Sequence, residues 1–203
     1  SDHSGWSYGG PRGKRVDGVD APFRDLPKGV PGPAARLPGP AFLYVMALPL
    51  VVWRAPEAQY AFVEVLGAVT VVVFWQALRR TFGERAAFLA ALVVACAPWS
   101  ALYADRTWNP NVLPLIVTLA FLAVLRLRDD PSSRWGIALF PLLAVMPQFH
   151  MAAPVAWAGL LVLLGKSALQ LPRRTIIIGL LLSALLYLPL VIHELPTGFS
   201  NTQ

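Results

Sequence analysis

The residues best suited to chemistry lie in one short polar stretch of an otherwise apolar chain. The stretch YADRTWNPN, Tyr103 to Asn111, contains Asp105, Arg106 and Asn109. A carboxylate such as Asp105 can act as a base or as a metal ligand, and the planar guanidinium of Arg106 can bind phosphate through two N–H groups. The alternative is structural: Asp105 and Arg106 are interfacial charges, and Asn109 caps the helix that Pro110 starts.

Two further ionisable side chains interrupt apolar sequence. Glu64 is predicted one turn inside the outer end of a membrane helix, where a carboxylate is costly unless it is neutral or faces water. His150 lies beside Gln148 in PQFHM and serves either as a ligand or as a hydrogen-bonded turn residue. The sequence contains no phosphate-binding glycine loop, zinc-type His/Cys spacing or nucleophile elbow, so we expect no soluble nucleotide chemistry.

Composition indicates that lipid surrounds most of this chain. Hydrophobic residues make up 56% of the 203 residues and charged residues 14%, against roughly a quarter charged in soluble domains. The formal net charge is +6, but the basic residues cluster at the ends of apolar runs, which argues against a nucleic-acid partner. Cys96 is the only cysteine, so the chain forms no internal disulfide or thiolate metal site.

The apolar runs predict an all-α, polytopic membrane protein. We expect an extracytoplasmic loop at 1–40, rich in Gly and Pro, an interfacial helix at 41–54, and a transmembrane domain at 55–203 with about six spans. The span from 135 to 165 would be about 46 Å long as one helix, so it is predicted to form a hairpin turning near PQFHM. The expected spans are Tyr60 to Leu78, Ala86 to Leu102, Val112 to Leu125, the hairpin from Trp135 to Gly165, and Thr175 to Ile192.

Charge predicts the orientation of these spans. The clusters RRTFGER (79–85), RLRDDPSSR (126–134) and KSALQLPRR (166–174) separate the apolar runs. The positive-inside rule places all three on the cytoplasmic side. Alternation of the spans then puts Asp105, Arg106, His150 and Glu194 on the outer face. The N-terminal loop lies there with them only if the helix from Ala41 to Trp53 does not cross the membrane.

The ordered series of segments resembles a known family. LPGPAFLYVMALPLVVW, then RRTFGERAAFLAALVVACAPWSALYADRTWNPN, then PQFHMAAPVAWAG, is similar to the bacterial branch of the GT-C integral membrane glycosyltransferases, glycosyltransferase family 39-like. This group is related to protein O-mannosyltransferases and lipid A aminoarabinose transferases, and the similarity covers most of Leu37 to about Leu164. The resemblance implies transfer of a sugar from a polyprenyl-phosphate donor to a protein, lipid or glycan acceptor. The reaction would take place on the extracytoplasmic face of the bacterial inner membrane.

The resemblance also implies roles for individual residues. Such enzymes carry an acidic pair in the loop after their first span, and SDHS is the nearest match, so Asp2 would be the general base. His3 stands where the family has a glutamate, which leaves Asp17 and Asp20 as alternative bases. Because the chain starts at SDHS without an initiator Met, we expect a first span to precede it.

On the same implied site, Arg106 would bind the donor phosphate, and Asp105 would assist catalysis or bind a divalent cation. Asn109 and His150 are assigned to substrate binding. Two other classes of function compete with the enzyme. In a transporter or flippase, Glu64 and His150 would line a translocation path, and a third alternative is a catalytically inactive membrane scaffold.

Overall fold

The computed structural model describes residues 15–16, 19–20, 40–98 and 107–197 of the chain. Contacts divide the chain into two compact units, Ser1–Arg36 and Leu37–Gln203. In the first unit, β1 (Arg15–Val16) and β2 (Val19–Asp20) pair antiparallel. Two strands of this length form only a small ribbon.

The second unit consists of α-helices and short 3-10 helices. Among the described residues, three helices are long and apolar enough to cross a membrane: 57–82, 110–129 and 173–192. This confirms the predicted all-α, polytopic membrane fold. The elements are α1 (Ala41–Val52), α2 (Glu57–Phe82), α3 (Glu84–Ala95), η1 (Asn109–Val112), α5 (Leu113–Asp129), α6 (Trp135–Phe149), α7 (Val155–Leu164), η2 (Gly165–Gln170), α8 (Arg173–Glu194) and η3 (Leu195–Thr197).

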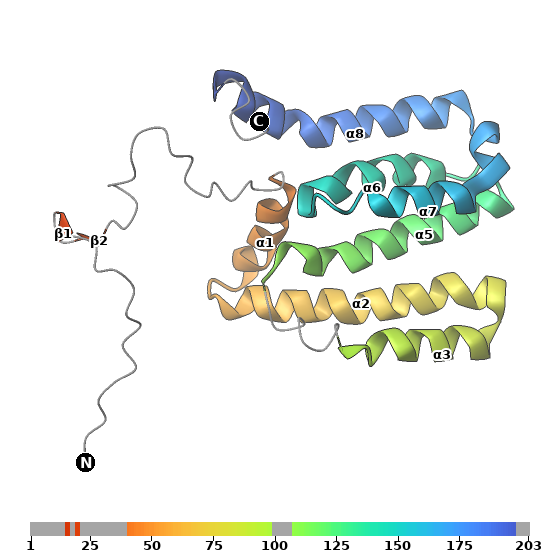
Figure 1. Cartoon of the computed structure of the whole chain (residues 1–203), viewed down its shortest axis with the longest axis horizontal. Coiled ribbons are helices and arrows are strands. Elements are labelled where there is room, and N and C mark those ends of the chain that lie inside the picture. Colours follow the sequence, from red (N-terminus) through yellow and green to blue (C-terminus); the bar gives the residue numbers. More distant parts are fainter. Residues whose placement is uncertain (1–14, 17–18, 21–39, 99–106, 198–203) are drawn as a thin grey trace, which may run out of the picture. The chain divides into compact units, whose positions relative to one another are not determined.

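A helix occupies every predicted span, although the bounds differ. In Figure 1, α2, α3, α5, α6, α7 and α8 run side by side along one direction, and α1 crosses one end of them. The predicted hairpin is present, since α6 ends at Phe149 and α7 begins at Val155. Helix α3 ends at Ala95, earlier than the predicted Leu102, and residues 99–106 lie outside the described part. Helix α1 forms where an interfacial helix was predicted; its position at the interface stays a prediction.

A glycine sets the tight turn between α2 and α3. Gly83 has φ 81°, a left-handed conformation in which a Cβ is strained. Its N–H donates to the carbonyl of Arg79 at 3.1 Å, and its own carbonyl accepts from Ala87 at 3.1 Å. One residue therefore ends α2 and starts α3, which packs antiparallel against it.

The core runs along α5. Ala120, Ala123, Val124 and Leu127 have no exposed surface, and α5 packs against α2, α6 and α7. The outer helices show the opposite pattern, since large apolar side chains such as Val162 of α7 are exposed. In water such a surface would be unstable, whereas lipid covers it in a membrane protein.

Two glycines let α6 and α8 approach closely. A Cβ added to Gly179 of α8 would clash with Phe140 of α6, including its Cγ at 2.8 Å. A Cβ on Gly136 of α6 would lie 2.5 Å from Cγ2 of Thr175 in α8. Small residues at helix interfaces are how membrane helices gain packing contacts without a hydrophobic driving force.

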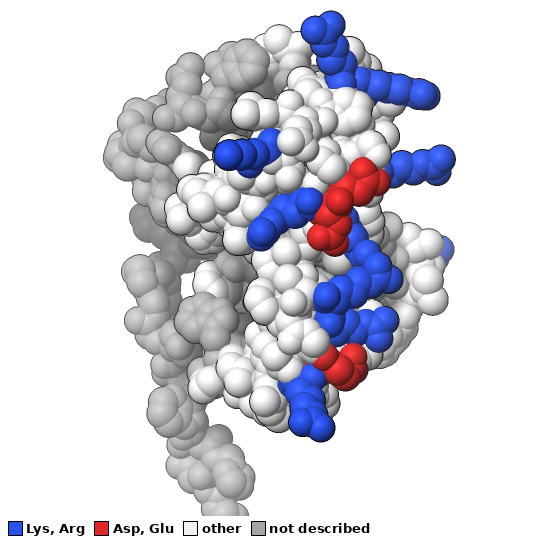
Figure 2. All heavy atoms as spheres, turned by 90° about the vertical axis from the view of Figure 1, so that its right-hand side faces the viewer, with Lys and Arg blue, Asp and Glu red and all other residues white. Residues whose placement is uncertain are grey.

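The charged turns lie together at one end of the helical unit. Figure 2 looks at the end formed by the α2–α3 turn, the α5–α6 turn and the start of α8, where basic side chains gather. The three basic clusters therefore share one side, as the charge pattern predicted. Which side of the membrane that is stays a prediction.

Candidate functional site

The opposite end of the helical unit holds the described candidate residues. It is formed by α1, the start of α2, η1 and the α6–α7 turn (Figure 1). We call it the α1 end. Helix α1 contacts α2 and α6, and η1 contacts α2, α5 and α6. Elements from four parts of the sequence thus meet here.

Two contacts hold α1 across this end. The side-chain Nε2 of Gln59 in α2 donates to the carbonyl of Met46 at 3.0 Å, and Met46 itself is buried. The rings of Phe42 and Phe149 meet edge to face, with centroids 6.4 Å apart and planes at 87°. The other side of α1 exposes large apolar side chains such as Leu48. One face is thus packed on the bundle and the other is free to contact lipid.

The residues after the polar stretch form η1. The 3-10 helix begins at Asn109, with Trp108 in the N-cap position and without a side-chain capping bond. Asn109 is thus the first residue of η1, one position before Pro110; whether its side chain caps the helix stays a prediction. Val112 is buried in the core, and this anchor fixes η1 at the α1 end.

His150 lies in the turn that joins α6 to α7. Its Nδ1 accepts a hydrogen bond from the N–H of Ala152 at 3.1 Å, and its carbonyl accepts from Ala153 at 2.9 Å. His150 is therefore a hydrogen-bonded turn residue, which was one of its two predicted roles. The ring is exposed, and with Nδ1 accepting, the proton of the neutral imidazole sits on Nε2, which can donate outward.

The remaining predicted site residues lie outside the described part. These are Asp2, Asp105 and Arg106, and the alternative base Asp17; Asp20 lies in β2 of the first unit. Their roles stay predictions. Among the described residues, no group of three His, Cys, Asp or Glu side chains gathers as metal ligands. Whether Asp105 binds a divalent cation is therefore untested.

Glu64 lies deeper in its helix than predicted. Helix α2 begins at Glu57 rather than near Tyr60, so Glu64 is two turns, about 10 Å, from the helix start. Its side chain is exposed on the surface of α2. A carboxylate at this depth has to reach toward the interface or find a polar neighbour.

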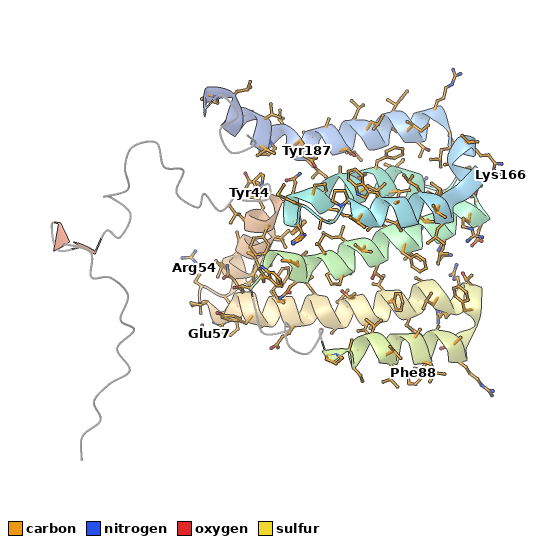
Figure 3. All side chains as sticks on the ribbon, viewed as in Figure 1. Tyr44, Arg54, Glu57, Phe88, Lys166 and Tyr187 are labelled. Atoms are coloured by element: carbon orange, nitrogen blue, oxygen red, sulfur yellow. The ribbon has the colours of Figure 1, made fainter. Side chains whose placement is uncertain are left out.

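Two charged residues at the α1 end were missed as candidates. Arg54 and Glu57 lie on either side of the corner between α1 and α2 (Figure 3), and both are exposed. Within the part of the chain that the structure describes, Arg54 thus supplies a positive charge at this end and Glu57 a negative one. Their position between the predicted interfacial helix and the first predicted span was a signal that they lie at a membrane surface.

A cavity of about 260 Å³ lies between α2, α5 and α7. Its walls include Phe74, Phe121 and Leu163, and Thr118 supplies the one polar side chain among the lining residues. Neither Glu64 nor His150 lines it. An apolar cavity of this kind suits hydrocarbon and gives no polar path for a transported solute.

The fold and the α1 end define a class of protein: a multi-pass α-helical membrane protein that gathers polar residues at one membrane face. The family model for dolichyl-phosphate-mannose-protein mannosyltransferases matches residues 37–193, nearly the whole helical unit. The chain belongs to this family, a group of membrane glycosyltransferases of the GT-C type. Comparisons with curated proteins and with solved structures found no match.

Proposed function

We propose that the protein transfers a sugar from a polyprenyl-phosphate donor to a protein, lipid or glycan acceptor on the extracytoplasmic face of the bacterial inner membrane. The observation that carries the proposal is the family match over residues 37–193. The family takes its name from a lipid-phosphate-linked sugar as donor and a protein as acceptor.

The proposed sugar transfer requires few catalytic groups. A sugar linked to a lipid phosphate already carries a leaving group, so the enzyme has to activate the acceptor hydroxyl and stabilise the departing phosphate. Asp2 is the proposed general base, and the guanidinium of Arg106 is the proposed phosphate ligand. Asp105 assists as a second carboxylate or as a ligand for a divalent cation.

The α1 end supports this placement. Arg106 directly precedes Thr107 and Trp108, and η1 then continues to the buried anchor Val112. Arg54 adds a positive charge at the same end (Figure 3). A phosphate group held in a lipid bilayer sits at the membrane surface, which is where charged residues between membrane helices lie.

His150 and Asn109 fit a role in orienting the sugar. Helices α6 and η1 contact each other, so the turn after α6 and the start of η1 lie at the same end. The Nε2–H of His150 is a donor suited to a sugar hydroxyl. Asn109 offers both a donor and an acceptor in its amide.

The site assignment is tested on the full-length protein with a radiolabelled polyprenyl-phosphate sugar. We expect Asp2→Asn and Arg106→Ala each to lower kcat/KM by at least about 100-fold, as for loss of a base or of a charge-stabilising group. Arg85→Ala, at the opposite end of α2 and α3, is the control and should retain activity. Wild-type rates in both site variants would overturn the assignment without overturning the transferase itself.

A further inference from the structure

One end of the helical unit carries a concentrated positive charge that the proposed reaction does not use. Figure 2 shows basic side chains spread over this end, with few acidic ones among them. We call this surface the basic face. Nine basic residues and three acidic ones make it up: Arg79, Arg80, Arg85, Arg126, Arg128, Arg134, Lys166, Arg173 and Arg174, with Glu84, Asp129 and Asp130.

The segments of the basic face converge around Gly136. A Cβ placed on Gly136 would lie 3.4 Å from Cδ2 of Leu127, 3.7 Å from Cδ2 of Leu171 and 2.5 Å from Cγ2 of Thr175. Leu127 lies between Arg126 and Arg128, and Leu171 and Thr175 flank Arg173 and Arg174. The α5–α6 turn and the start of α8 therefore bring their cations to one place.

These cations are not neutralised by neighbouring carboxylates. Within residues 40–98 and 107–197, no ion pair joins a basic side chain of the face to an acidic one. Arg79 instead lies over the ring of Trp75, 4.8 Å from its centroid. The carboxylate of Asp130 accepts bonds from the Oγ and N–H of Ser132, at 2.6 and 2.9 Å, and both bonds lower its pKa.

Helix stability explains only some of these positions. Arg79 and Arg80 lie in the last turn of α2, where the helix dipole favours a cation. Arg173 and Arg174 begin α8, which has no acidic residue in its first turn. Cations at that end oppose the dipole and repel one another, so an anion bound there would relieve both effects.

We propose that the basic face binds anionic phospholipid headgroups of the leaflet into which it projects. The face lies where membrane helices begin and end, which is the depth of lipid phosphates. Seven of its nine cations are exposed, the exceptions being the half-buried Arg79 and Arg126. The cations are spread over an end surface, and so match a layer of phosphates better than one small ligand. Arg128, Arg173 and Arg174 are all exposed and form the centre of the binding surface.

The test uses the full-length protein in phosphatidylcholine nanodiscs, titrated with a fluorescent phosphatidylglycerol. Both leaflets have the same composition, so membrane orientation does not enter the result. We expect the triple variant Arg128→Gln, Arg173→Gln and Arg174→Gln to bind about 100-fold more weakly than the wild type. The matched triple lysine variant keeps the charge and should bind within about threefold of the wild type.

Three outcomes would overturn the proposal. The first is equal binding by the wild type and the glutamine triple. The second is no preference of the wild type for phosphatidylglycerol over a fluorescent phosphatidylcholine. The third is displacement of the lipid by a soluble oligonucleotide, which would identify a different polyanion as the partner. If the triple variant does not fold, Arg173→Gln alone should weaken binding about fivefold, and an unchanged affinity counts against the proposal.

Discussion

The hydroxyl of Tyr187 donates a 2.7 Å hydrogen bond to the carbonyl of Ala144, joining α8 to α6. One turn further along α6, the side-chain Nε2 of Gln148 donates to the carbonyl of Leu186 at 3.4 Å. The two bonds run in opposite directions between the same pair of helices. They fix the half of α8 that leads to the α1 end, where His150 follows Gln148 by two residues.

The bond from Tyr187 predicts a measurable loss of stability. Tyr187→Phe removes the donor and keeps the ring, so we expect the free energy of unfolding to fall by about 0.6 kcal/mol, a typical value for a hydrogen bond between membrane helices. Thermal unfolding in detergent measures it as a lower Tm. Tyr44→Phe on the exposed face of α1 is the matched control and should leave Tm unchanged; equal Tm values for both variants would contradict the assigned bond.

The close packing at Gly179 predicts a larger effect. A Cβ there would meet Cγ of Phe140 at 2.8 Å and its Cβ at 2.9 Å, and no side-chain rotation of Phe140 moves its Cβ away. Gly179→Ala should therefore destabilise the protein by roughly 1–3 kcal/mol through overpacking. The measurement is again Tm in detergent.

The control for that substitution is a glycine in open space. A Cβ on Gly159 of α7 would have no neighbour within 4 Å, so Gly159→Ala should leave Tm unchanged or raise it, since alanine favours the helix. If Gly179→Ala proved as stable as Gly159→Ala, the close contact between α6 and α8 would be wrong.

Topology is tested by cysteine labelling after Cys96 is replaced by alanine. Thr107 precedes η1 at the α1 end, and Ser132 lies in the α5–α6 turn at the basic face. A membrane-impermeant maleimide should label Thr107→Cys in intact cells, and Ser132→Cys only after permeabilisation. The reverse pattern would invert the orientation and move the α1 end to the cytoplasm.

The two charged residues at the α1–α2 corner predict an effect on donor binding. Arg54 is three residues from Glu57, and both are exposed. If Arg54 attracts the donor phosphate, Arg54→Gln should raise KM for the donor by roughly threefold to tenfold with kcat little changed. Glu57→Gln removes a negative charge at the same corner and is the control. It should lower KM for the donor or leave it unchanged. A fall in kcat alone for Arg54→Gln would argue against a role in phosphate binding.

The sequence predicted much of the helical unit, because apolar run length and charged turns are local features. The hairpin between Trp135 and Gly165 followed from its length and from the basic clusters at both of its ends, and the shared side of the three basic clusters followed from charge. Contacts between distant segments were not predictable in this way. Nothing in the sequence around Gln59 indicates a bond to the carbonyl of Met46, because side-chain direction depends on how α1 crosses α2.

The site was predicted less completely. His150 lies in the turn where the sequence placed it. The helix after the polar stretch begins at Asn109 rather than at Pro110, because capping preferences do not define a helix start to one residue. Arg54 was missed because a single cation beside an interfacial helix is indistinguishable from an ordinary solvated charge until the fold places it at the α1 end. Asp2, Asp105 and Arg106 stay predictions.

The central claim is that the protein transfers sugar from a lipid-linked donor, and donor choice tests it most directly. The full-length protein in membrane vesicles is supplied with the same radiolabelled sugar, either on a polyprenyl phosphate or on a nucleotide, and transfer to acceptor is counted. We predict transfer from the polyprenyl phosphate and none from the nucleotide sugar. Transfer from the nucleotide sugar alone, or from neither donor across protein, lipid and glycan acceptors, would contradict the claim.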